Sequence, residues 1–302
     1  MPLTEPQRGT LYAITANLIW GLAALYWIET RPVDARDLLA HRVLWSVPVV
    51  ALILLFLGRL RAALALLLKP RTVGIMALAA VCIASNWLIF VWAVTNEHAT
   101  EASLGYFLLP LFNVLLGLTL FRERIDRAQF VGILCAVVAV LLQTWHYGGL
   151  PLVAIGLVLS FGFYGAIRKS VAVESLEGLL LETLMLLPLG LGWLVLHDWG
   201  GLGAHGSKVD IFLVGAGIFT AVPLIAYVAA SRILPLTALG LVFYIGPSAQ
   251  LLVAVLVFGE PFDLIQALAF TLVWVGLAIV TVDSMRRSRQ LARVVPATTM
   301  AK

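Results

Sequence analysis

Two ionisable residues lie inside long apolar segments, where a charge is costly and usually indicates function. Arg42 lies near the start of an apolar segment over residues 38–57, and Glu182 lies near the start of another over 178–196. An arginine in this setting suits an anionic group such as a carboxylate, whereas a glutamate suits a cationic group or a proton. Snorkelling to the headgroups, or a local pair with backbone carbonyls, is the alternative for both residues.

Amide, aromatic and further ionisable side chains in neighbouring segments extend this candidate pathway. Because an amide in hydrocarbon needs hydrogen-bond partners, we expect Asn86 and Asn113 to face the interior of a helix bundle. The full set of candidate substrate-binding or pathway residues is Arg42, Glu182, Asn86, Trp87, Trp20, Tyr106, Asn113, Tyr164, Tyr244, Glu101 and His41.

Some aromatic and ionisable residues also have plainer explanations. On a helix, His41 points about 100° away from Arg42, so it fits a contact between helices as well as a cavity. Glu101 begins an apolar segment, where the helix dipole favours an acid. Four tryptophans near segment ends are expected to be interfacial belt residues: Trp27, Trp145, Trp193 and Trp199.

Prolines inside the apolar segments remove backbone donors and allow kinks. We expect Pro48, Pro110, Pro188 and Pro247 to act as hinges, with a static bend as the alternative, and Pro223 shares this setting. The motifs HExxH, GxSxG and Walker A do not occur in the sequence, and its two cysteines have no metal-ligand spacing. We therefore expect no enzymatic activity, no cofactor and no metal.

The composition points to a membrane. Of 302 residues, 62% are hydrophobic and only 12% are charged, with a mean hydropathy of +1.02, whereas soluble domains carry about 25% charged residues. The apolar residues form blocks long enough to cross a bilayer as helices. Ten spans are predicted, near 9–28, 38–57, 73–95, 101–121, 128–145, 151–167, 178–196, 209–230, 236–258 and 264–282.

The distribution of basic residues predicts the orientation. Of the 20 Lys and Arg residues, 16 lie on the side of both termini, 3 lie on the other side, and Arg42 lies within a span. This bias places both termini in the cytoplasm. Because the basic residues flank apolar blocks, membrane topology explains the net charge of +4 better than nucleic-acid binding does.

The two halves of the sequence resemble each other. Pro110 and Glu123 recur as Pro247 and Glu260 at an offset of 137 residues. At an offset of 140, Asp37, Arg42, Leu44 and Pro48 match Glu177, Glu182, Leu184 and Pro188. We expect one five-helix repeat over 1–147, a second over 148–285, and a basic cytoplasmic tail over 286–302.

Five spans reverse the direction of the chain, so the second repeat is predicted to be inverted in the bilayer. Inverted repeats are typical of transporters and place a binding cavity near the midplane. Arg42 and Glu182 then lie toward opposite membrane surfaces, so we predict that they do not form an ion pair with each other.

Several motifs resemble those of a known family. The pairs His41-Arg42 and Asn86-Trp87, the run EASLGYF over 101–107, and the run YIGP over 244–247 are similar to RarD proteins, of the EamA group of the drug/metabolite transporter superfamily. The similarity runs from about residue 8 to residue 285 and implies ten spans, a bacterial inner-membrane location and solute transport. Phe243 departs from this pattern, where glutamine is expected, which puts one polar contact of the cavity in doubt.

The sequence therefore predicts an all-α membrane protein that acts as a secondary transporter of a small metabolite or amphipathic compound. We expect an exporter that works by alternating access, as a monomer or weak dimer. A channel or a membrane sensor for a small solute is the alternative.

Overall fold

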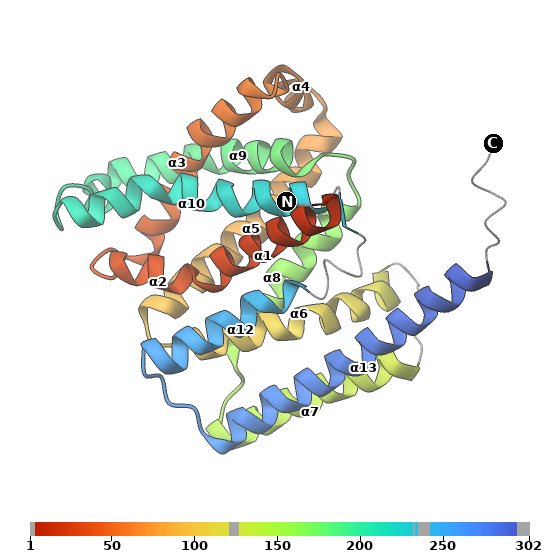
Figure 1. Cartoon of the computed structure of the whole chain (residues 1–302). Coiled ribbons are helices and arrows are strands. Elements are labelled where there is room, and N and C mark those ends of the chain that lie inside the picture. The colour runs from red at the N-terminus through yellow and green to blue at the C-terminus, as the bar shows by residue number, and fades with distance from the viewer. Residues whose placement is uncertain (1–3, 121–126, 232, 235–241, 295–302) are drawn as a thin grey trace, which may run out of the picture.

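The computed structural model describes residues 4–120, 127–231, 233–234 and 242–294, and every regular element in these ranges is a helix (Figure 1). The helices are α1 (Glu5–Gly21), α2 (Ala23–Trp27), η1 (Ile28–Thr30), α3 (Ala35–Phe56), α4 (Leu60–Ala65), η2 (Leu66–Leu68), α5 (Pro70–Thr95), α6 (Ala99–Leu120), α7 (Arg127–Tyr147), α8 (Leu152–Lys169), α9 (Ser175–Leu196), η3 (Asp198–Gly201), α10 (Ser207–Ser231), α12 (Ile245–Leu252), η4 (Val253–Val257) and α13 (Leu264–Val294).

Among the described residues, eight helices are long and apolar enough to cross a membrane: α3, α5, α6, α7, α8, α9, α10 and α13. The first predicted span is broken into α1 and the helix over Ala23–Thr30, with a bend of 43° between them, and it makes a ninth span if the two parts cross together. The predicted span over 236–258 lies partly outside the described residues, where its described part is the short apolar helix Ile245–Val257. The protein is thus an all-helical, multi-pass membrane protein, and the tenth span remains a prediction.

The helices α3 and α9 occupy matching places in the two predicted repeats. Each has 22 residues, and Pro48 and Pro188 occupy the same position within them. The two helices pack against each other and run antiparallel. Trp193, near the end of α9, donates a hydrogen bond of 2.7 Å to Asp37, near the start of α3. At the other end, Arg59, after α3, pairs with Glu177, near the start of α9, at 2.6 Å.

Other equivalent helices follow the same pattern. The helices α7 and α13 form an outlying pair in Figure 1, and His146 at the end of α7 meets Asp263 just before α13 at 3.1 Å. The helix α1 packs on α10 and α12, as its equivalent α8 packs on α5 and α6. Each half of the chain therefore packs mainly against the other half. In the pairs α3–α9 and α7–α13, the two helices are antiparallel.

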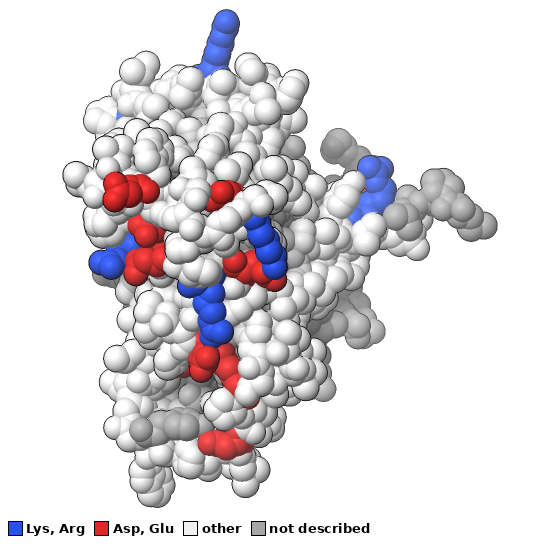
Figure 2. Space-filling view, turned by 90° about the vertical axis from the view of Figure 1, so that its left-hand side faces the viewer, with Lys and Arg blue, Asp and Glu red and all other residues white. Residues whose placement is uncertain are grey.

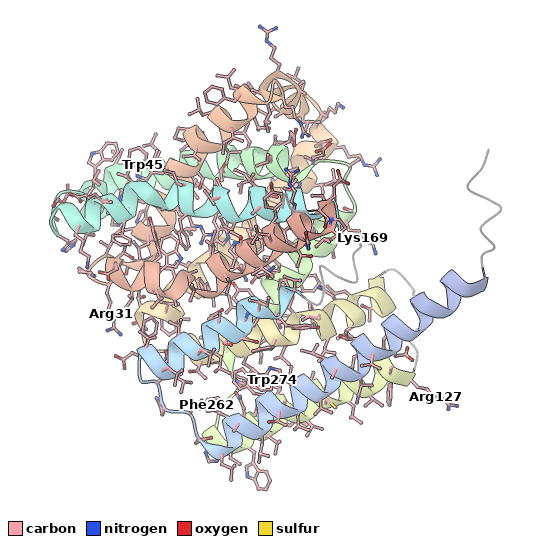
Figure 3. All side chains as sticks on the ribbon, viewed as in Figure 1. Arg31, Trp45, Arg127, Lys169, Phe262 and Trp274 are labelled. Atoms are coloured by element: carbon pink, nitrogen blue, oxygen red, sulfur yellow. The ribbon has the colours of Figure 1, made fainter. Side chains whose placement is uncertain are left out.

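Glycines allow two of these contacts to be unusually close. A Cβ atom at Gly217 of α10 would overlap the backbone of Trp45 on α3, a residue labelled in Figure 3. A Cβ atom at Gly21 of α1 would lie 2.6 Å from the carbonyl oxygen of Gly246 on α12. Small residues let backbones approach in this way, and van der Waals packing is the main attraction between helices in lipid.

The charged residues gather at the two ends of the bundle. Figure 3 shows Arg31 at one end and Arg127 and Lys169 at the opposite end. Figure 2 looks onto the end of Arg31, where Lys and Arg side chains lie beside Asp and Glu side chains. The ion pairs there are Arg31–Glu97, Arg36–Asp34 and Lys208–Glu29. The hydrogen bond from Arg36 lowers the pKa of Asp34, whose carboxylate also caps the start of α3.

Candidate functional site

Arg42 lies in an aromatic cage near the centre of the bundle. Its guanidinium carbon lies 4.1 Å from the centre of the Trp87 ring and 5.3 Å from that of Trp27, and its Nε donates a hydrogen bond to Thr220 at 3.0 Å. Four helices supply these groups, since Trp27 is on α2, Arg42 on α3, Trp87 on α5 and Thr220 on α10. Tyr26 also lies within electrostatic range of the guanidinium. The ring faces are electron-rich and attract the cation.

The cage holds a cation without a counter-ion. Among the described residues, no Asp or Glu lies within ion-pair distance of Arg42. The side chain is 9% exposed, and Nε is its only nitrogen with a hydrogen bond to a described residue. A buried charge is normally paired because its desolvation costs several kcal/mol. The two terminal nitrogens have no hydrogen-bond partner within the described part of the chain.

Asn86 joins three helices beside this cage. Its amide nitrogen donates to the carbonyl of Leu157 and to the hydroxyl of Ser160, both at 3.2 Å, and its oxygen accepts from Tyr106 at 3.1 Å. Asn86 is 1% exposed, which confirms the expectation that its amide faces the interior. Tyr106 in turn lies within electrostatic range of Arg42. These contacts fix the positions of α5, α6 and α8 around the guanidinium.

Glu182 occupies a second polar cluster. It is fully buried, its Oε2 accepts a hydrogen bond from Tyr164 at 3.2 Å, and its Oε1 lies 3.6 Å from Nε of Arg168. Arg168 also donates to the carbonyls of Val173 and Glu174. Its guanidinium lies against the backbone of α9, where a Cβ atom at Gly178 would overlap it. Glu182 and Arg42 have separate partners, as the sequence predicted.

A network of ion pairs lies at the end of the bundle nearer to Glu182. Arg59 meets Glu174 and Glu177 at 2.6 Å each, so it ties the end of α3 to the start of α9. The hydrogen bond to Glu174 raises the pKa of the Arg59 guanidinium. Through Glu177, this network lies on the same helix as Glu182.

The structure places five of the candidate residues away from both clusters. His41 is bonded through Nε2 to the carbonyl of Trp199 at 3.0 Å, and Glu101 accepts from the amide of Val153 at the start of α8 at 2.9 Å. Trp20 packs against Tyr227, and Tyr244 packs against Phe243. Asn113 is exposed in this conformation, and the expectation that it faces the interior of the bundle stays a prediction.

Glu260, an acid of the predicted repeat, binds the start of a helix. Both carboxylate oxygens of Glu260 accept backbone hydrogen bonds of 2.7 Å, from Ala99 and Thr100 at the start of α6. Glu260 thus caps a helix of the first half from the second half. Its repeat counterpart Glu123 lies outside the described residues.

Three residues of the two clusters were not among the candidates predicted from the sequence. Trp27 was expected to be an interfacial belt residue, but it is 1% exposed and covers Arg42. Arg168 was counted as a charge of a connecting loop, and Thr220 was not singled out. Trp145, by contrast, is 86% exposed, as expected for a belt residue. The sequence does not show that Trp27 contacts Arg42, because the two residues lie on different helices and their contact depends on how those helices pack.

The candidate hinges lie in two settings. Pro48 and Pro188 are exposed on the outer faces of α3 and α9, whereas Pro247 is buried at the start of α12. Pro247 accepts a hydrogen bond through its carbonyl from Ser103 at 2.9 Å. Pro110 lies within α6 and is partly buried. Pro48, Pro110 and Pro188 lie inside continuous helices, and Pro247 lies near the start of a short one. Hinge motion at them remains a prediction.

Comparison with known proteins places this geometry in a family. Residues 7–145 match the EamA-like transporter family. The chain is 39% identical over 293 residues to protein RarD of Salmonella typhimurium, covering 96% of this chain and 100% of the relative. It is 40% identical to an uncharacterized transporter of Pseudomonas aeruginosa (96% and 99%) and 32% identical to the chloramphenicol-sensitive protein RarD of that organism (95% and 97%). A solved crystal structure matches with a TM-score of 0.62 at 22% identity, over 92% of this chain and 98% of that one, which supports the fold alone.

The fold and these matches define a multi-pass membrane transporter of bacterial type. The chain belongs to the EamA-like transporter family and, within it, to the RarD proteins of the drug/metabolite transporter superfamily.

Proposed function

We propose that this protein is a secondary transporter that binds an anionic group of a small metabolite or amphipathic compound at Arg42. The uncompensated, buried guanidinium between two tryptophan rings is the observation that carries this proposal. A carboxylate would accept hydrogen bonds from the two terminal nitrogens, and charge-assisted bonds of this kind are about twice as strong as neutral ones. The ring faces would also contact an apolar part of the substrate.

The proposed architecture is ten spans in two inverted five-helix repeats, with both termini in the cytoplasm. The antiparallel packing of α3 on α9 and of α7 on α13 supports this arrangement. In it, Arg42 lies in the periplasmic half of the bundle and Glu182 in the cytoplasmic half. Repeats of this kind can exchange conformations between two mirror-related states, which is the basis of alternating access.

Glu182 is the proposed second contact of the pathway. Its carboxylate is fully buried, and Oε1 has no hydrogen-bond partner within the described residues. Arg168 lies near this oxygen at an ion-pair distance that is longer than a hydrogen bond. A cationic group of the substrate, or a proton, would supply the missing partner of Oε1.

Binding is tested by a thermal-shift screen of purified wild-type protein and the Arg42→Met variant against amino acids, organic acids and amphiphilic drugs. A ligand of the folded state raises the unfolding temperature, and we expect the active compounds to carry an anionic group and to lose their effect in the variant. Compounds that stabilise both proteins equally would remove Arg42 from the binding site.

Transport is tested with the compounds found in this way. In proteoliposomes we expect saturable transport and counterflow, which a carrier shows and a channel does not. We expect export in the cell, and protein inserted in one known orientation tests this direction. Flux without saturation or counterflow would support the alternative of a channel, and binding without flux would support a sensor.

A further inference from the structure

A lipid-facing groove lies on the outer side of the Arg42 cage. It has a volume of about 420 Å³ and runs between α1–α2 and α10. Its lining is almost wholly apolar and includes Ile19, Tyr26, Ile211, Phe212, Gly215 and Phe219. Ile218 flanks it and is 58% exposed, so the groove opens toward the bilayer.

Tyr26 is the floor of this groove and also the outer neighbour of the cage. Its ring stacks on Phe219 at 4.2 Å and meets the edge of Trp27 at 5.0 Å, and its hydroxyl donates a hydrogen bond to the carbonyl of Phe212. Trp27 then covers Arg42. The side chains of Tyr26 and Trp27 therefore lie between the groove and the guanidinium of Arg42.

The backbone beside this layer is weakened in both walls. The chain bends by 43° between α1 and α2, next to Ile19 and Tyr26. In α10, Pro223 has no N–H to donate to the carbonyl of Phe219, four residues earlier. Gly215 leaves room for the Tyr26 hydroxyl, which would lie 2.8 Å from a Cβ atom there. These features allow Tyr26 and Phe219 to move apart without breaking a regular helix.

We infer that an amphipathic anion reaches Arg42 sideways from the bilayer through this groove, with Tyr26 as the movable side chain between them. This inference rests on the proposed anion site at Arg42. The carboxylate of the substrate pairs with the guanidinium, and its hydrocarbon part lies in the groove between α2 and α10. A phosphatidylcholine, whose headgroup has no net charge, would fill the apolar groove but would gain less from the charge behind it.

The test uses a fatty acid with a diazirine in the middle of its chain, with the protein in lipid nanodiscs and labelled peptides mapped by mass spectrometry. We expect labelling of the groove segments of α2 and α10. Each 1.4 kcal/mol of lost binding is tenfold in affinity, so Arg42→Met should lower groove labelling about tenfold. Ile218→Trp, which fills the groove, should lower it similarly. Leu189→Trp, at an exposed position of α9, should leave it unchanged.

Two results would overturn the inference. Groove labelling that is insensitive to Arg42→Met and equals that by a diazirine phosphatidylcholine would show bulk lipid contact. Labelling that depends on Arg42 but not on Ile218→Trp would show access by another route. Because a substitution can prevent folding, each variant is first checked by thermal unfolding.

The mild variant Tyr26→Phe, which loses only the hydrogen bond to Phe212, should increase the rate of groove labelling. An unchanged rate would count against Tyr26 as the movable side chain.

A water-soluble carboxylate separates this inference from the proposed function. Benzoate binding, measured by titration calorimetry, should depend on Arg42 but not on Ile218. If benzoate requires Arg42 and the fatty acid does not label the groove, only the lateral route fails. If Arg42→Met leaves benzoate binding unchanged, the anion site itself fails.

Discussion

Replacing Arg42 with methionine should weaken ligand binding strongly while changing the stability of the empty protein little. Two desolvated cation–π contacts contribute about 2 kcal/mol each, and the charged hydrogen bond to Thr220 contributes about 2 kcal/mol. Desolvation of an ion costs several kcal/mol, which is of the same size. Methionine is shorter than arginine, but it is flexible and apolar and fills part of the space beside Trp27 and Trp87, so we expect a net change within about 2 kcal/mol.

The stabilisation caused by bound ligand, unlike the stability of the empty protein, should differ clearly between wild type and Arg42→Met. A ligand present at about 100 times its Kd stabilises the folded state by about 2.7 kcal/mol. If the variant binds tenfold more weakly, the same concentration stabilises it by only about 1.4 kcal/mol. Thermal unfolding in nanodiscs, with and without ligand, measures both quantities. Arg36→Met is the matched control, because Arg36 is an exposed arginine on the same helix that pairs with Asp34 and lies over the ring of Trp193.

Two outcomes would refute this reasoning. A loss of more than about 4 kcal/mol in the empty variant would show that Arg42 is a structural residue whose charge is compensated in the native protein. An equal ligand-induced stabilisation in wild type and Arg42→Met would show that the guanidinium does not contact the ligand.

Three further sets of substitutions test the packing around the site, each by thermal or denaturant unfolding. Arg168→Met should cost about 3–5 kcal/mol because it leaves a buried carboxylate unpaired, and adding Glu182→Gln should restore most of that loss; independent effects would exclude coupling between the two residues. Gly217→Ala should cost about 1–3 kcal/mol because its Cβ overlaps the backbone of α3, whereas Gly165→Ala, with open space around its Cβ, should stabilise α8 by about 0.5–1 kcal/mol; equal effects would argue against the close contact. Asn86→Ala should cost about 2–3 kcal/mol by leaving buried partners unpaired, and a loss below about 0.5 kcal/mol would contradict its role as a connector.

Hydropathy predicted most of the fold, because in hydrocarbon each helix must satisfy its own backbone hydrogen bonds. The helices α3, α5, α7, α8, α9, α10 and α13 lie where long apolar blocks occur in the sequence. The repeat was also readable, since Pro48 and Pro188 recur at the offset that separates α3 from α9. The break at Leu22 was not predicted, because the residues around it are as apolar as those of an unbroken span.

The candidate site was predicted in part. Arg42, Trp87, Asn86 and Tyr106 form one connected group, and Glu182 with Tyr164 forms another. Glu101 and His41 instead bind backbone groups of neighbouring elements. A charged or amide residue inside a span must find a partner, but the sequence does not say whether that partner is a substrate or a helix end.

The sequence by itself determined that this chain is a helical membrane protein and that Arg42 and Glu182 are costly charges within apolar segments, and it predicted that the two halves are related. These conclusions depend on the free energy of moving residues out of water, which is a property of each segment. Only the tertiary structure decided which groups meet them. Trp27 covers Arg42, and Arg168 approaches Glu182, because helices from different parts of the chain cross there. Such contacts depend on the rotation and crossing of whole helices, to which no single residue type is a guide.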